Sequence, residues 1–179
     1  MHELQASACV FRIHRDVRFS KNKAPYKPNF GASITKGGRK SLIPGYYIHL
    51  QPNGQSFIGG GLYHPPAPLL KAVRQEIDYN TEAFDALVNA ANFLATYGKL
   101  QGDQLQRAPK GYDPTHSAIK WLKHKDFIAM KQVPDTMWTS ADAVEKVATD
   151  LRVLQPLKSF LAMPLADEEV QEALRRYQR

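Results

Sequence analysis

Five cations lie within twelve residues near the start of the sequence, accompanied by one carboxylate and one phenol. The cations are Arg12, Arg15, Arg18, Lys21 and Lys23, and the other two groups belong to Asp16 and Tyr26. Arginine presents a rigid fork of donors that matches carboxylate and phosphate oxygens. The segment therefore predicts a site for an anionic ligand, bound by the five cations and Tyr26. The structural alternative is that Asp16 pairs with one of the arginines and the motif organises the sheet and the loop that follows it.

Two further segments could contribute to such a site. Residues 59–61 are three consecutive glycines, which fit neither nucleotide-binding fingerprint, yet the backbone amide of Gly60 could bind an anion. The alternative is a bulge, or close approach of another backbone. Residues 110–113 could bring a second cation, that of Lys110, and a carboxylate to the same cleft, where Tyr112 is a further ligand-binding candidate, or they could belong to a plain turn. If there is catalysis, Asp16 and Asp113 are the acid–base candidates, because neighbouring cations would keep them ionised.

The histidines, serines and the cysteine show no spacing typical of a metal site or of a catalytic nucleophile. The six histidines include no pair at the helical spacing of a metal site, so neither a metal nor a cofactor is predicted. No serine stands in a nucleophile elbow. The lone cysteine, Cys9, excludes an internal disulfide framework and is expected to be a small packed thiol.

The positive charge is concentrated in the first quarter of the chain. The formal net charge is +7, and residues 1–40 hold nine Lys and Arg against two acidic residues, while the remainder is balanced. This asymmetry suggests an anionic partner for the N-terminal region: a small phosphorylated or carboxylated ligand, or a nucleic acid. A plainly solvated face is the alternative.

Hydrophobic periodicity predicts the elements that would position these groups. Residues 9–19, 46–50, 56–62 and 126–133 alternate or cluster as strands, and Asn53-Gly54 predicts a tight hairpin turn. Arg15 falls on the apolar face of the first strand, where a bulge would re-aim it or a buried partner would have to pair with it. Residues 20–45 read as a basic loop with an extended piece near 30–34, and helices are predicted at 68–77, 80–98, 116–123, 139–154 and 167–179.

The order of these elements gives the fold class. Strands come early and most helices late, so we expect an α+β fold: a mainly antiparallel sheet from the N-terminal half packed against helices mostly from the C-terminal half. The 179 residues, 43% of them hydrophobic, fit one domain over 1–179. No apolar run is long enough to span a membrane, and no secretory pattern opens the chain. With one cysteine, a cytoplasmic protein without a membrane partner is expected.

Residues 12–19, Arg-Ile-His-Arg-Asp-Val-Arg-Phe, followed by Lys23 and Tyr26, resemble the signature of a family of bacterial and fungal conserved hypothetical proteins, domain of unknown function 2461. Residues 44–47, 59–63 and 109–114 resemble the same family, so the resemblance extends over nearly the whole chain. It implies an uncharacterised protein. Members of the family usually carry a helical section ahead of the signature, so the chain is interpreted as a domain that is truncated at its N-terminus.

Three functional hypotheses follow. The first is an anionic small ligand bound in a cleft between the segment 12–26, the glycine-rich strand end and the Lys110 loop, with enzymatic activity left open. The second is a nucleic-acid-binding module that uses the basic N-terminal quarter. The third is an interaction protein, which a partner or a second copy would complete. A deep pocket containing the signature arginines favours the first, a flat exposed basic surface the second, and a bare apolar face the third.

Overall fold

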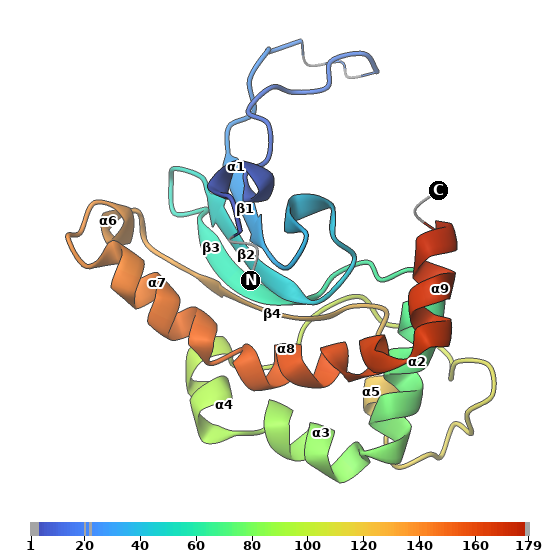
Figure 1. Cartoon of the computed structure of the whole chain (residues 1–179). Coiled ribbons are helices and arrows are strands. Elements are labelled where there is room, and N and C mark those ends of the chain that lie inside the picture. The colour runs from blue at the N-terminus through green and yellow to red at the C-terminus, as the bar shows by residue number, and fades with distance from the viewer. Residues whose placement is uncertain (1–3, 20, 22, 178–179) are drawn as a thin grey trace.

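A four-stranded antiparallel sheet forms the centre of the molecule (Figure 1). The computed structural model describes residues 4–19, 21 and 23–177. The sheet has the order β1-β2-β3-β4, and its strands are β1 (Phe30–Ile34), β2 (Gly45–Leu50), β3 (Phe57–Leu62) and β4 (Phe127–Gln132). Most helices follow β3 in the chain and pack against one side of the sheet. The α+β class with an antiparallel sheet from the N-terminal half is therefore confirmed.

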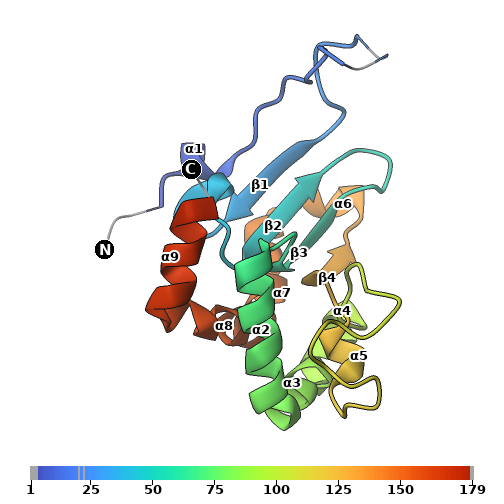
Figure 2. The same cartoon turned by 90° about the vertical axis from the view of Figure 1, so that its right-hand side faces the viewer.

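The helical layer lies on one face of this sheet, as Figures 1 and 2 show from two sides. Helices α7 and α8 contact β3, and α2 and α3 pack beside them. The helices of the described residues are α1 (Ala6–Cys9), α2 (Ala67–Tyr79), α3 (Thr81–Val88), α4 (Ala91–Tyr97), α5 (Ile119–Leu122), α6 (Asp135–Trp138), α7 (Ala143–Arg152), α8 (Gln155–Ala162) and α9 (Glu168–Tyr177), with 3-10 turns η1 (Gly38–Lys40) and η2 (Met163–Ala166). Within the described residues, none of them is long and apolar enough to cross a bilayer.

The hairpin between β2 and β3 forms where the sequence predicts it. Asn53 and Gly54 have φ values of 68° and 69°, the left-handed conformation that these two residue types tolerate, and they lie within the connection 51–56 between the strands. The Asp135 carboxylate accepts hydrogen bonds from both of their backbone amides, at 2.9 Å and 3.1 Å. The turn is thereby fastened to the segment that follows β4.

The core lies between the sheet and the helices. Alternate residues of a strand point to opposite faces, so Ile58, Leu62, Phe127 and Ala129 all point to the helical side, where they are buried. Helix α2 adds Leu69, Val73 and Ile77 at helical spacing, as its apolar periodicity predicted. The core therefore uses one face of the sheet.

The prediction of a continuous strand over 9–19 is wrong. Within this segment the structure has two isolated bridges, Val10 with Ala32 and His14 with Tyr26. The six-residue step from 26 to 32 faces a four-residue step from 10 to 14, and this mismatch interrupts a regular ladder. Residues 10–19, 21 and 23–29 instead form two extended segments with irregular antiparallel pairing, which we call the basic arm.

The single helix predicted over 80–98 is also wrong, because the chain forms α3 and α4 with a break between them. The side-chain amide of Asn89 donates to the Asp85 carbonyl at 2.7 Å and ends α3, and Ala90 is extended (ψ 139°). Competition of an asparagine side chain with the helix backbone explains the break. The predicted end of the helical region at Gly98 is confirmed.

Candidate functional site

The basic arm projects from the body of the molecule beyond the start of β1 (Figure 1). Its two segments run antiparallel, held by hydrogen bonds from Arg15 N to Pro25 O and from Lys27 N to Ile13 O, each 2.9 Å long. Arg12, Arg18, Lys21, Lys23 and Tyr26 are all exposed on it, and Arg15 is half-buried. The arm therefore brings together all the signature cations that the sequence marks as candidates.

One carboxylate on the arm serves two arginines. Arg18 donates from Nε to Asp16 Oδ1 at 3.0 Å and from Nη2 to Oδ2 at 2.7 Å, while Arg12 Nη2 lies 3.6 Å from Oδ2. The hydrogen bonds from Arg18, more than the charge of Arg12, lower the pKa of Asp16. The structural interpretation of the motif expected such a pairing. The two arginine side chains nevertheless stay 66% and 76% exposed, so their outer edges face solvent.

The alternating pattern placed Arg15 on an apolar face, and in the structure its side chain is half-buried. Its backbone amide holds the two segments together, and its Nε atom is buried without a hydrogen-bond partner among the described residues. A buried guanidinium nitrogen that is not satisfied costs free energy unless a ligand or water pairs with it. Lys23 Nζ donates to Val17 O at 2.8 Å, which ties the far ends of the two segments.

The arm also carries aromatic side chains outside the core. The ring of Phe19 is 95% exposed and Tyr26 is more than half exposed, as is Phe30 where β1 begins. His14 and Tyr26 face each other across the arm with ring centroids 5.3 Å apart. The arm thus presents cations and aromatic rings on one extended, solvent-facing element.

Gly60 lies elsewhere, inside the sheet. It belongs to β3, which is paired on both sides, and it is buried. A Cβ atom here would come within 2.7 Å of the Gly45 carbonyl oxygen and 3.2 Å of Leu154 on the helical side. Close approach of a neighbouring backbone and of Leu154, the residue just before α8, therefore explains why this position is glycine.

Lys110, Tyr112 and Asp113 lie in the loop between α4 and α5, which both views show well apart from the arm (Figures 1 and 2). Lys110 is exposed, whereas Tyr112 is half-buried against His116 with its pKa raised chiefly by burial. The Asp113 carboxylate accepts a 2.7 Å hydrogen bond from Thr115 N, and its bonds to Thr115 lower its pKa. This carboxylate closes a local turn, and the structure does not bring the loop to the arm.

The family model for "Conserved hypothetical protein (DUF2461)" matches residues 1–160. The chain belongs to this family. The match covers the arm, the glycine strand and the loop before α5, and it confirms the family that the motifs resemble. A search of the curated proteins and a search of the solved structures gave no match.

One buried polar site of this DUF2461 member was not predicted from the sequence. Asp126 is buried just before β4, and its carboxylate accepts hydrogen bonds from His64 N at 2.7 Å and Asp103 N at 3.1 Å. His64 has a φ of 44°, and its Nδ1 lies 3.4 Å from the same carboxylate. A lone aspartate before an apolar run gives no signal of this role, because both partners are distant in sequence. The carboxylate joins two loops at one end of the sheet.

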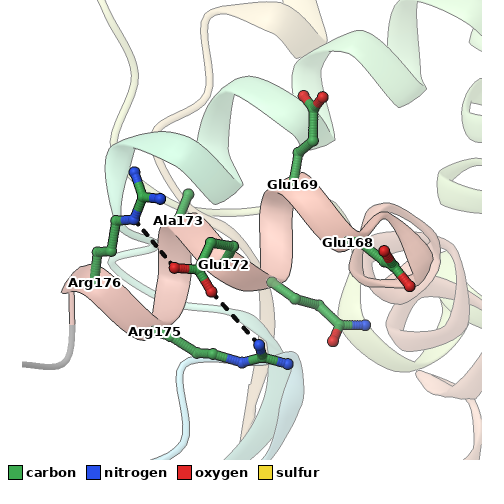
Figure 3. A pocket seen from close by; sticks show the side chains of 7 residues that line it. Glu168, Glu169, Glu172, Ala173, Arg175 and Arg176 are labelled. Carbon is green, nitrogen blue, oxygen red and sulfur yellow. Dashed lines mark hydrogen bonds and ion pairs between the residues drawn. The ribbon is translucent and has the colours of Figure 1, made fainter.

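Two surface hollows of this family member lie outside the arm. One, of about 610 Å³, runs along α9, where Glu172 pairs with both Arg175 and Arg176 (Figure 3). The other, of about 410 Å³, is lined by residues of β4, α6 and α7 and by Asp142, and includes the 2.7 Å ion pair of Lys131 with Asp150. Neither is lined by a signature cation. Among the described residues, no group of three or more His, Cys, Asp or Glu side chains could hold a metal ion.

Proposed function

We propose that this DUF2461 chain binds a nucleic acid through the basic arm. The observation that carries the proposal is the exposure of four of the five signature cations on one extended element. An exposed row of arginines and lysines suits a polyanion, because each cation can reach a different phosphate. A small ligand would instead call for cations that converge in an enclosed pocket.

The charge balance of the arm supports the same function. Residues 12–27 hold six basic residues and one acidic residue, and that carboxylate is shared by Arg12 and Arg18. Exposed Phe19 and Tyr26 add rings beside these cations, an association common in proteins that bind single strands.

The test is a salt titration of fluorescence anisotropy with a labelled 15-nucleotide strand. The arm variant carries Arg18→Gln, Lys21→Gln and Lys23→Gln. We expect its affinity at 100 mM salt to fall tenfold or more and the slope of log K against log salt to shrink by about 2, since roughly 0.7 counterion is released per phosphate contact. The matched control carries Lys71→Gln, Lys99→Gln and Arg107→Gln, which removes the same charge from exposed sites outside the arm.

Equal losses in the two triple variants would contradict the proposal, because only net charge would then matter. A parallel thermal-shift panel of nucleotides, sugar phosphates and polycarboxylates examines the rival ligand class. Saturable stabilisation by one small anion, with negligible oligonucleotide affinity at physiological salt, would assign the arm to a small ligand instead.

A further inference from the structure

The sheet has a second face, turned away from the helical layer. The strand register places on it Gly31 and Ser33 of β1, Gly45, Tyr47 and His49 of β2, Phe57, Gly59 and Gly61 of β3, and Ile128, Met130 and Gln132 of β4. Four of these residues are glycines. Gly59 and Gly61 are buried, and a Cβ atom at Gly31 would lie 2.7 Å from the Tyr47 hydroxyl, so the large side chains form the outer surface of this face.

Aromatic rings gather on this face. The His49 ring stacks on Phe57 with centroids 4.6 Å apart and planes within 11°, and Tyr47 lies 5.8 Å from Phe57. Tyr63, which follows β3, is 67% exposed and close enough to Tyr47 to help burial raise the pKa of that phenol. These four side chains, Tyr47, His49, Phe57 and Tyr63, are the aromatic face.

Hydrogen bonds fix the orientation of the rings. His49 Nε2 lies 3.0 Å from Gln51 Oε1 and its Nδ1 lies 3.5 Å from the Tyr47 hydroxyl. Since the amide oxygen can only accept, Nε2 carries the proton and Nδ1 accepts from the phenol. Asn29 also donates to Gln51 Oε1, at 3.4 Å, and so links this row to the root of the arm. Rings held in place in this way lose little conformational entropy when a ligand stacks on them.

The aromatic face and the arm are continuous. Val10 is bridged to Ala32 on β1, and the next side chain, Phe11, packs edge-on against Tyr47 with centroids 6.2 Å apart. Arg12 follows immediately and begins the row of cations. A polyanion held by the arm would therefore run alongside the rings. Positive charge on this border favours a ligand that combines phosphates with flat apolar groups over an apolar helix of a partner protein.

We propose that the aromatic face stacks unpaired bases, so that the nucleic acid bound by the arm is single-stranded. The inference rests on the proposed function. Bases of a duplex are stacked on one another and cannot lie on protein rings, whereas a single strand can splay its bases onto aromatic side chains of an open sheet face.

The experiment compares three labelled probes: a 15-nucleotide thymidine strand, an abasic strand with the same number of phosphates, and a 15-base-pair duplex. Wild-type protein should bind the thymidine strand at least tenfold more tightly than the abasic strand. Tyr63→Ala and Phe57→Leu should each weaken binding of the thymidine strand roughly fivefold or more and leave binding of the abasic strand and the salt slope unchanged. The matched control is Tyr79→Ala on α2, where the ring is 84% exposed on the helical side of the molecule.

The outcomes separate this inference from the proposal on which it rests. Salt-dependent binding with equal affinity for the thymidine and abasic strands would overturn the stacking role and leave the function of the arm standing. Preference for the duplex would do the same. A wild-type protein with no salt-dependent binding to any probe would overturn both. A concentration-dependent dimer that Phe57→Leu dissociates, without any preference for the thymidine strand, would assign the face to a second copy of the chain. Because Tyr63 lies largely in solvent, its variant keeps the test valid even if Phe57→Leu fails to fold.

Discussion

Residues 59–61 and the basic arm both resemble the family and both suggest anion binding in the sequence, but the structure treats them in opposite ways. The glycines are enclosed between two strands and the helical layer, and side chains there would collide with main-chain atoms. The arm projects from the body, and most of its described side chains are exposed. Packing therefore explains why residues 59–61 are glycines. It does not explain why the basic arm is rich in arginine and lysine. A sequence motif is therefore stronger evidence for a ligand where packing of the fold does not require its residue types.

The largest expected effect concerns the glycine strand. Gly61 has a φ of 121°, and a Cβ atom there would lie 2.1 Å from the Phe127 carbonyl oxygen. Because backbone strain and overpacking add, Gly61→Ala should lower the free energy of unfolding by roughly 3–5 kcal/mol or prevent folding. Urea denaturation followed by circular dichroism measures it.

The control for Gly61→Ala is Gly54→Asn in the hairpin turn. That position has a φ of 69° and no atom within 4 Å of a Cβ, so asparagine should cost less than about 1 kcal/mol. Equal losses in the two variants would mean that the close approach of β4 does not determine the glycine.

A pH titration sharpens the contrast between the two regions. His124 is buried in the body, where its Nδ1 donates to Asp126 O at 3.0 Å and its Nε2 accepts from the Gln104 amide at 2.9 Å. Burial lowers the pKa of His124 below its ordinary 6.5. The unfolded chain then binds the proton more readily, so this residue should leave stability constant above about pH 6.5 and reduce it as the pH falls below that value.

Thermal unfolding from pH 5 to 8 checks the role of His124. His124→Gln should flatten the loss of stability on the acid side, because the buried imidazole whose pKa is lowered is then absent. A profile that is identical in wild type and His124→Gln would show that the acid sensitivity comes from other groups.

The smallest effect on stability is expected at Asp16. Substitution there should strengthen nucleic-acid binding, whereas removal of cations from the arm should weaken it. Its carboxylate is 41% exposed and shared by two exposed arginines, so Asp16→Asn should leave the free energy of unfolding nearly unchanged. Removing a negative charge that competes with phosphate should strengthen oligonucleotide binding severalfold, as anisotropy at 100 mM salt would reveal. Weaker binding by this variant would mean that the carboxylate is needed to shape the arm.

Local signals in the sequence predicted much of the fold. Asn53-Gly54 specifies its hairpin through the φ values it tolerates, and α2 follows from the spacing of Leu69, Val73 and Ile77. The break at Asn89 and the irregular pairing of residues 9–19 were missed because both depend on competition between nearly equal local arrangements.

The candidate site was predictable only as a set of residues. Composition located the cations of the arm, and the family match supports the motif they form. Their exposure, the separation of Lys110 from the arm and the role of Asp126 depend on contacts between distant segments, which no periodicity encodes. The pairing of β2 with β3 aligned Tyr47, His49 and Phe57 on one face, and neither strand shows this cluster by itself.

The bridge between Val10 and Ala32 has a consequence for solubility. Strand β1 stands at one margin of the sheet, where unpaired peptide groups would invite pairing with another molecule. Val10 and Phe11 occupy part of that margin, and Gln101 bridges Ile128 at the opposite margin. Removal of residues 1–29 should therefore expose the edge of β1, which could then form backbone hydrogen bonds with the β1 edge of a second molecule. By covering this edge, Val10 and Phe11 at the base of the arm protect the molecule against fibril-like association.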